Sequence, residues 1–285
     1  MPELPEVEIA TRNLRSWLAG ERLTRVELPS SRVLRGVAPE ALSKLLAGKR
    51  VETLERRGKW IRLALSGGAV LHSHLGMTGK WVLRDRSDGP QKYERARFDT
   101  RRRSVRYLDP RLFGRLLASP HGEPLAAWDA LGPDPLVDGI DARVLGATLA
   151  RTRRSIKEAL MDQSVLAGVG NIQAAEALWR ARIHPQLAAD RLARDPAAVR
   201  SLARAILASI EFTLRDEAGP EITYVEEPGA RNPFKVYGRA GEPCPRCSAS
   251  LKRIVQGGRS TVFCARCQRR SALTSGGGCA TRRRT

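Results

Sequence analysis

The order of apolar and polar residues predicts a helix at the start of the chain. The apolar residues of this stretch recur at helical spacing, and they are Val7, Ala10, Leu14, Trp17 and Leu18. Gly20 follows them, and glycine is a common residue just past the end of a helix. We therefore expect an amphipathic helix from about Glu3 to Leu18.

The next hundred residues have a different texture. Between about Arg22 and Ser119, short apolar runs alternate with breaks of Gly, Asp and Pro. Runs of this length between turn residues are typical of β-strands. The runs lie at residues 51–54, 60–65, 69–72, 80–83 and 105–108. The pattern predicts a strand-rich domain, either a sandwich or a barrel.

After residues 133–135 the pattern becomes helical. We expect helices at residues 141–151, 154–163, 171–181 and 196–215. Asp195 before Pro196 is a good start for the last of them, because it offers a capping oxygen ahead of a first-turn proline. Residues 217–239 lack periodicity and predict a long loop, and such loops are often functional. The stretch after Arg270 has nothing to bury and predicts a disordered basic tail.

Charge narrows the class of partner. The 285 residues carry a formal net charge of +20, and such a surplus binds polyanions by releasing their counterions. Nucleic acid is the partner that this charge favours, although an arginine-rich solvated surface is the alternative. No apolar stretch is long enough for a membrane span, and the N-terminus is acidic rather than a basic secretion signal. We expect a cytoplasmic protein.

Four cysteines have the spacing of a zinc site. Cys244 and Cys247 form one Cys-x-x-Cys pair, and Cys264 and Cys267 form another after sixteen residues. Four thiolates in this pattern predict one structural Zn²⁺. A zinc knuckle that only stabilises the C-terminus or binds protein is the alternative, but the surrounding arginines favour DNA. The fifth cysteine, Cys279, is expected to be an incidental free thiol.

Between the cysteine pairs the chain predicts a hairpin. Residues 251–255 and 260–263 would be its strands, and the glycines of residues 256–259 permit a tight turn. Arg259 would be displayed at the tip of this hairpin.

The N-terminus offers unusual chemistry. Removal of Met1 ahead of a small residue would leave Pro2 as a free secondary amine. The adduct of such an amine with a sugar aldehyde is a cationic iminium, which promotes elimination of the flanking phosphates. Glu3 and Glu6 fall three residues apart on one helical face, so both carboxylates can stand beside the amine. Ordinary helix capping by proline and acids is the alternative for this segment alone.

Six segments, taken together, favour the catalytic interpretation of the N-terminus over ordinary helix capping. They occur in order at residues 2–8 (PELPEVE), 56–60 (RRGKW), 74–79 (HLGMTG), 109–114 (DPRLFG), 155–163 (SIKEALMDQ) and 165–171 (VLAGVGN). This set resembles the formamidopyrimidine-DNA glycosylase and endonuclease VIII family over roughly residues 2–272. The resemblance is closest to the bacterial formamidopyrimidine-DNA glycosylases.

The resemblance implies the catalytic residues. Pro2 would be the Schiff-base nucleophile, Glu3 the acid that opens the deoxyribose ring and Glu6 a supporting carboxylate. Lys59 would contact phosphate beside the lesion and help to hold the sugar. Arg259 would clamp the phosphates around the flipped nucleotide.

The resemblance also implies residues that hold the distorted DNA. His74 would contact phosphate, and Asn171 would bind the phosphate that flanks the lesion. Lys157 would lie near the DNA backbone or the base pocket. Flipping a nucleotide loses stacking energy that an apolar filler must replace. Met77 and Phe113 would be the fillers, and Arg111 would contact the estranged cytosine.

Pattern and resemblance together predict an α+β multidomain fold. We expect a catalytic β-sandwich domain with its N-terminal helix at residues 1–132 and a helix-two-turns-helix domain at 133–236. A loop near 217–235 would cap the lesion. A zinc-finger β-hairpin would occupy residues 237–272, and residues 273–285 would be the disordered basic tail.

The implied function is that of a bifunctional DNA glycosylase and abasic-site lyase of base excision repair. The enzyme would remove 8-oxoguanine and formamidopyrimidines from damaged duplex DNA and nick the strand by β,δ-elimination. We expect a monomer in the cytoplasm, associated with the nucleoid.

Two alternatives to this function stay open. The same chemistry could act on oxidised pyrimidines or other adducts, because the capping loop lacks the Gly-aromatic-Phe stretch of the purine branch. A non-catalytic damaged-DNA-binding protein is the other, and Pro2, Glu3 and Lys59 argue against it.

Overall fold

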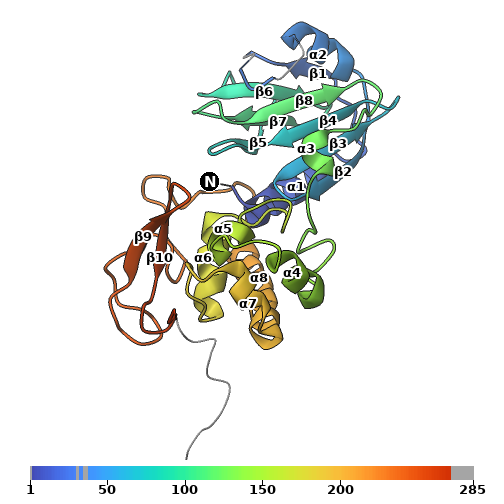
Figure 1. Cartoon of the computed structure of the whole chain (residues 1–285). Coiled ribbons are helices and arrows are strands. Elements are labelled where there is room, and N and C mark those ends of the chain that lie inside the picture. The colour runs from blue at the N-terminus through green and yellow to red at the C-terminus, as the bar shows by residue number, and fades with distance from the viewer. Residues whose placement is uncertain (1, 30–31, 35–37, 271–285) are drawn as a thin grey trace, which may run out of the picture. The chain divides into compact units, whose positions relative to one another are not determined.

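The computed structural model describes residues 2–29, 32–34 and 38–270. The predicted basic tail and Cys279 lie outside this range. The chain divides into two compact units (Figure 1). Of the described residues, unit 1 comprises those within 2–139, 162–170 and 210–233, and unit 2 comprises those within 140–161, 171–209 and 234–270.

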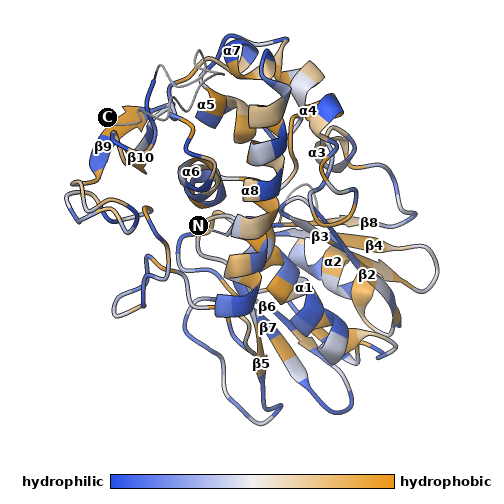
Figure 2. Ribbon diagram, turned by 90° about the horizontal axis from the view of Figure 1, so that it is seen from below, coloured by the Kyte–Doolittle hydropathy of each residue, from blue (hydrophilic) through white to orange (hydrophobic). Residues whose placement is uncertain are grey.

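Unit 1 opens with helix α1 (Leu4–Leu18), as the apolar spacing predicted. Glu3 occupies the N-cap position, and the side chains of Glu3 and Glu6 form a capping box with each other's backbone N–H groups. The helix packs against three strands of this unit, namely β2, β3 and β5, whose bounds follow. Figure 2 shows the mixture of apolar and polar residues along α1. Its amphipathic pattern thus fixes the start of the chain on the sheets.

Two four-stranded antiparallel sheets form the body of unit 1. One has the order β1 (Arg25–Glu27), β6 (Glu94–Asp99), β7 (Ser104–Leu108) and β5 (Lys80–Arg84). The other has the order β2 (Val51–Arg57), β3 (Trp60–Leu65), β4 (Val70–His74) and β8 (Arg115–Ser119). Helices α2 (Pro39–Leu46) and α3 (Ala126–Asp129) complete the described part of this unit up to Gly139.

The two sheets share one core. Side chains from both, including Ile61 and Leu71 of one and Phe98 and Tyr107 of the other, belong to a single buried apolar cluster. Face-to-face packing of this kind defines a β-sandwich. The predicted sandwich is confirmed, and the barrel alternative is wrong.

Several elements of unit 1 were not predicted from the apolar pattern of the sequence, and strand β6 shows why. Its residue Arg97 is buried and donates to Asp99 at 3.0 Å. On the neighbouring strand β7, Arg106 is fully buried and donates to Glu94 at 3.0 Å. Paired charges inside a sheet look like a surface loop when only hydrophobicity is considered. The short strands β1 and β8 and helix α2 were missed as well.

Unit 2 is mostly helical. It contains α4 (Ala142–Leu149), α5 (Ile156–Leu160), α6 (Asn171–Arg180), α7 (Ala189–Ala193) and α8 (Pro196–Asp216), whose last residues from Ile210 onward belong to unit 1. Asp195 caps α8 as predicted, because its Oδ1 accepts from the backbone N–H groups of Ala197 and Ala198, both at 3.0 Å. Helix α5 is shorter than the predicted 154–163, since Ser155 caps its start and Asp162 begins a turn.

After α8, the described part of the chain forms a two-stranded hairpin of β9 (Lys252–Gln256) and β10 (Arg259–Phe263). Gly257 and Gly258 form its turn with φ values of +53° and +71°, which glycine adopts without strain. The hairpin packs with α6 around Trp179, Val236 and Val262. Within the described residues, no helix combines the length and apolar character that crossing a membrane requires.

Candidate active site and nucleic-acid interface

The start of α1 is a buried polar cluster. Pro2, Glu3 and Glu6 are all buried. The Glu3 N–H donates to Glu6 Oε2 at 2.8 Å, and Glu3 Oε2 accepts from the Gly170 N–H at 3.0 Å. The Leu4 N–H donates to the Gly168 carbonyl at 3.0 Å. These bonds fix the turn at 168–170 against the first residues of α1.

Gly170 shows how closely this cluster is packed. A Cβ placed on Gly170 would lie 2.5 Å from Glu3 Oε1 and 2.7 Å from Lys59 Nζ, closer than real Cβ atoms approach other groups. The Glu3 carboxylate and the Lys59 ammonium therefore lie beside the same point of the backbone. Since the Gly170 N–H donates to Glu3, the glycine also ties this point of the backbone to the carboxylate.

Asp134 holds the turn that presents Lys59. This buried carboxylate accepts from the Gly58 N–H at 2.7 Å and from Arg56 Nη2 at 2.9 Å. Burial favours the neutral acid, but the hydrogen bonds and charge of Arg56 outweigh it and lower the pKa of Asp134. Removing one partner of such a buried pair costs about 3–5 kcal/mol. The sequence alone does not reveal the role of Asp134, because its partners are more than seventy positions away along the chain.

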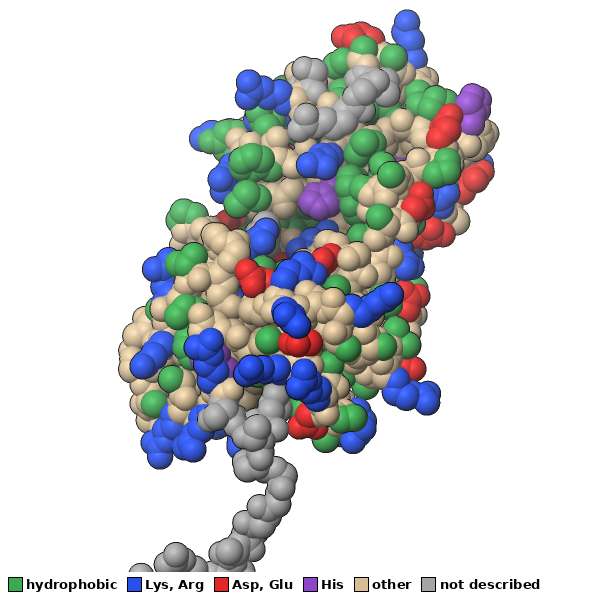
Figure 3. Space-filling model, in the orientation of Figure 1, with side chains coloured by type: hydrophobic (Ala, Val, Ile, Leu, Met, Phe, Trp, Pro, Cys, Tyr) green, Lys and Arg blue, Asp and Glu red, His purple; other side chains and the backbone are tan. Residues whose placement is uncertain are grey.

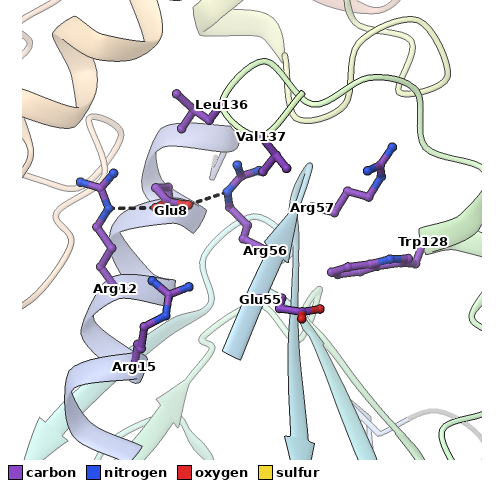
Figure 4. Close-up of a pocket in the computed structure, with 9 residues that line it drawn as sticks. All are labelled: Glu8, Arg12, Arg15, Glu55, Arg56, Arg57, Trp128, Leu136 and Val137. Atoms are coloured by element: carbon purple, nitrogen blue, oxygen red, sulfur yellow. Dashed lines mark hydrogen bonds and ion pairs between the residues drawn. The ribbon is translucent and has the colours of Figure 1, made fainter. Parts of the chain in front are cut away.

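Arg56 also pairs with Glu8 on α1, at 2.8 Å (Figure 4). A cavity of about 490 Å³ lies beside this pair, and Arg12, Arg57 and Trp128 are among its lining residues. Neither Pro2 nor Lys59 lines it. The cavity is thus separate from the polar cluster at the start of α1.

His74 is a neutral hydrogen-bond donor. Its Nδ1 accepts from the Gly76 N–H at 3.0 Å, and its ring packs edge-on against Trp60. Burial, together with the charges of Lys59 and Arg115, lowers the pKa of His74 to about 4. With Nδ1 occupied as an acceptor, the proton of the neutral ring is on Nε2. The neutral ring thus keeps one donor, the Nε2–H group.

The predicted intercalating residues come from two adjoining loops of unit 1. Buried Asp109 accepts from Thr78 Oγ1 at 2.7 Å and from the Gly114 N–H at 2.8 Å, so it joins the loop of Met77 to that of Phe113. Phe113 is 49% exposed, although it is a large apolar side chain. The Arg111 guanidinium lies 4.9 Å from its ring centroid. An exposed aromatic ring and an arginine at one place suit contact with unstacked bases.

Unit 2 holds the remaining predicted residues. Lys157 is fully buried, and its Nζ donates to Asn171 Oδ1 and Thr261 Oγ1, both at 2.6 Å. These bonds connect α5, the start of α6 and strand β10. Lys157 therefore positions Asn171 and the hairpin, and its predicted proximity to DNA stays a prediction. Arg259 is exposed beside the turn of the hairpin, as expected.

The four paired cysteines form a compact cluster. The Sγ atoms of Cys244, Cys247, Cys264 and Cys267 all lie within 4.8 Å of one another. A tetrahedral zinc with Zn–S bonds of about 2.3 Å places its sulfurs about 4 Å apart, so the cluster fits one Zn²⁺. Four protein ligands leave no open position, and the metal is accordingly structural.

Comparison with known proteins agrees with this arrangement. Three family models match in chain order: the formamidopyrimidine-DNA glycosylase N-terminal domain at residues 1–116, the H2TH domain of the same enzymes at 131–220, and the zinc finger found in FPG and IleRS at 241–270. The formamidopyrimidine-DNA glycosylase of Roseiflexus sp. is 40% identical, over 94% of this chain and 100% of its own. The chain belongs to the formamidopyrimidine-DNA glycosylase family.

Solved structures of the family have the same fold. A Lactococcus lactis FPG mutant, bound to DNA containing Fapy-dG, matches with a TM-score of 0.84 and 29% identity, over 94% of this chain and 100% of that one. A MutM complex with DNA containing carbocyclic 8-oxo-G matches with the same values. The expected α+β fold with its zinc hairpin is thereby confirmed.

Membership in the family makes the chain a DNA glycosylase of base excision repair, and abasic-site lyase activity is a general property of the family. Its surface suits this role. Lys and Arg side chains are spread over the face shown in Figure 3 and outnumber the acidic ones. DNA is therefore the partner that the net charge of +20 predicted.

Proposed function

We propose that this chain removes oxidised purines from duplex DNA and cleaves the strand, with the amine of Pro2 as nucleophile. The observation that carries the proposal is the polar cluster at the start of α1. Glu3 Oε1 and Lys59 Nζ both lie within 3 Å of one point beside Gly170, and Glu3 follows Pro2 directly. A nucleophile, an acid and a cation within one buried cluster are the parts that a glycosylase-lyase needs.

In the first step the Pro2 nitrogen forms a bond to C1′ of the flipped nucleotide, and the C1′–N9 bond breaks. The departing purine keeps the bonding electrons and takes up a proton, while the Pro2 nitrogen loses one. Glu3 delivers a proton to the ring oxygen O4′ as the C1′–O4′ bond opens. The product is an iminium between Pro2 and C1′.

The iminium then acts as an electron sink. Loss of a proton from C2′ expels the 3′ phosphate, and loss of a proton from C4′ expels the 5′ phosphate. Water finally hydrolyses the iminium and restores the Pro2 amine. Lys59 supplies a positive charge for a phosphate beside the sugar during these eliminations.

The DNA is held by residues of both units. In unit 1, the His74 N–H and Arg111 supply donors, and Met77 and Phe113 fill the space that the flipped base vacates. In unit 2, Asn171 and Arg259 contact phosphates, and Lys157 fixes their positions. These roles are supported by the exposure of Phe113 and Arg259, by the hydrogen bonds of His74 and Lys157, and by the family's DNA-bound relatives.

The capping segment supports a second candidate for the substrate, because it bears on which damaged base the enzyme accepts. The predicted capping segment near 217–235 is partly anchored to unit 1. Ile222 and Tyr224 are buried in the core, and Tyr224 Oη donates to the Gly79 carbonyl at 2.6 Å. This half cannot fold over a base without breaking those contacts. Oxidised pyrimidines are therefore the alternative substrate class.

Borohydride trapping tests the proposal. The protein is incubated with duplexes that carry 8-oxoguanine opposite cytosine, an oxidised pyrimidine, an abasic site or no damage. We expect a covalent complex with 8-oxoguanine and with the abasic site, and none with Pro2→Gly. Pro120→Gly, at an exposed turn of unit 1, is the matched control and should trap normally.

Each other outcome has a distinct meaning. Trapping on the oxidised pyrimidine but not on 8-oxoguanine would favour the alternative substrate class. Tight binding without any trapping would favour a non-catalytic damaged-DNA-binding protein. Undiminished trapping by Pro2→Gly would refute the proline mechanism.

The domain boundaries near residues 132 and 236 and the cytoplasmic, nucleoid-associated location also belong to this proposal. They are supported by the matched ranges of the family models and by the family's DNA-bound structures.

A further inference from the structure

A second carboxyl group meets Glu6 at the start of α1. Glu217 follows the last residue of α8, and its side chain is hydrogen-bonded to that of Glu6. The two residues are 211 positions apart in the sequence, and both belong to unit 1. Two carboxyl groups can share a hydrogen bond only when one of them is protonated. The structure thus contains an acid–carboxylate pair that the mechanism above does not use.

The chain fixes Glu217 from both sides. Its N–H donates to the Thr213 carbonyl at 2.9 Å and closes the last turn of α8. On the other side, the Gly219 carbonyl accepts from Asn13 Nδ2 of α1 at 2.9 Å, and Ile222 is buried in the core of unit 1. The position of Glu217 beside Glu6 is therefore determined by the fold.

The hydrogen-bonding pattern shows which member holds the proton. Glu6 Oε2 accepts from the Glu3 N–H at 2.8 Å, and a backbone donor stabilises the ionised form of a carboxyl group. Glu217 Oε2 is buried and has no hydrogen-bond partner among the described residues. An unpartnered oxygen is far less costly to bury on a neutral acid than on an anion. The proton accordingly belongs to Glu217.

The electrostatics agree with this assignment. Burial, followed by the charge of Glu3, raises the pKa of Glu6 to about 7. Burial, followed by the charge of Glu6, raises the pKa of Glu217 to about 9. Asp216 at the end of α8 also raises the pKa of Glu217, and the positive charge of the N-terminal amine lowers the pKa of both carboxyl groups. The hydroxyl of Tyr224 feels the charge of Glu6, and burial raises its pKa well above its usual value.

We propose that Glu217 is a positioning residue for the reaction: its neutral carboxyl donates a hydrogen bond to Glu6 and thereby keeps the Glu6 carboxylate ionised beside Pro2. The inference rests on the proposed function of Pro2. Glu6 is bonded to the N–H of Glu3, the residue that follows Pro2, so its carboxylate lies one residue along the chain from the proposed nucleophile. A negative charge there stabilises the cationic iminium as it forms.

The test separates hydrogen bonding from proton transfer. Single-turnover cleavage of an abasic-site duplex is measured from pH 5 to 9 for the wild type, Glu217→Gln and Glu217→Ala. Glutamine keeps a donor to Glu6, and alanine removes it. We expect Glu217→Gln to stay within about 3-fold of the wild type at pH 7. Glu217→Ala should lose about 10-fold, because Glu6 without its donor becomes protonated at higher pH.

The pH profile gives the decisive readout. In Glu217→Ala the acid limb should move up by about one pH unit, whereas a merely structural loss would lower the rate equally at every pH. Equal impairment of the glutamine and alanine variants would overturn the inference, since it would mean that Glu217 must itself titrate. An unshifted profile in the alanine variant would overturn it as well. Glu211→Ala, an exposed acid on α8, is the matched control.

A double-mutant cycle with Glu6→Gln protects the test against a folding defect. If Glu217 acts through Glu6, Glu217→Ala should have no further effect on the rate in the Glu6→Gln background. An additive loss would contradict the inference.

Pro2→Gly is measured alongside. If Pro2→Gly still cleaves normally, the proposed function fails. If only Pro2→Gly fails and Glu217→Ala matches the wild type, the Glu217 inference alone is wrong.

Discussion

The polar cluster at the start of α1 and the zinc hairpin differ in how they place their charged groups: the cluster buries them, and the hairpin exposes them. The cluster buries Glu3 and Glu6, and its parts come from residues 2–6, Lys59, the turn at 168–170 and Glu217. The hairpin exposes Arg259, and a single local segment with four cysteines supports it. Bond-making chemistry requires fixed groups in a dry site, whereas a phosphate contact requires only a charge on a stable support. Changes in the cluster should therefore alter turnover, and changes in the hairpin should alter affinity.

The largest effect should come from Gly170→Ala. The new Cβ would collide with the Glu3 carboxyl group and the Lys59 ammonium. We expect kcat/KM on abasic-site DNA to fall roughly 1000-fold, since small displacements of catalytic groups are severe. The Kd for a non-cleavable analogue should change less than about 3-fold. Gly146→Ala in α4 is the control, because its Cβ would meet Val199 at an ordinary 3.7 Å. Normal turnover by Gly170→Ala would contradict the described cluster.

Loss of zinc should have the next largest effect, and on affinity. Cys264→Ser, or prolonged chelation, removes the support of the hairpin, because such small sites fold with their metal. We expect DNA affinity to fall about 100-fold, while the sandwich of unit 1 keeps its own unfolding transition. Cys279→Ser, outside the four-cysteine set, should retain the zinc and the affinity. Equal affinity of the zinc-free and zinc-loaded proteins would show that the hairpin does not bind DNA.

The smallest effects should come from Arg259→Ala and His74→Ala. They distinguish a charged phosphate contact from a neutral one. Arg259→Ala should reduce the slope of log K against log salt by about 1, because one fewer counterion is released. His74→Ala should weaken binding about 3-fold without changing the slope at pH 7. The reason is that the pKa of His74 is lowered to about 4, so the ring is neutral unless the pH falls toward that value. A slope change in His74→Ala at pH 7 would show that this histidine is charged.

The same contrast explains what the sequence could predict. Strand β3 and the hairpin were predicted closely because their signals are local, namely an apolar run and a pair of glycines. Strand β6 was missed because buried Arg97 and its partner Asp99 have no hydrophobic signal.

Within the site, the resemblance to a known family supplied Pro2, Glu3 and Lys59, but Asp134 and Glu217 were missed. Each of these two acts on a partner far away along the chain, and only the fold shows the pairing. The bond from the Gly170 N–H to Glu3 likewise joins residues that are 167 positions apart, so the sequence does not reveal it.

The most direct test of the central claim is to locate the trapped sugar on the protein. The borohydride-reduced complex with abasic-site DNA is digested with nuclease and protease, and the modified peptide is sequenced by mass spectrometry. We expect a peptide that begins at Pro2 and carries the deoxyribose remnant on its N-terminal nitrogen. A remnant on the side chain of Lys59 or of another lysine would contradict it.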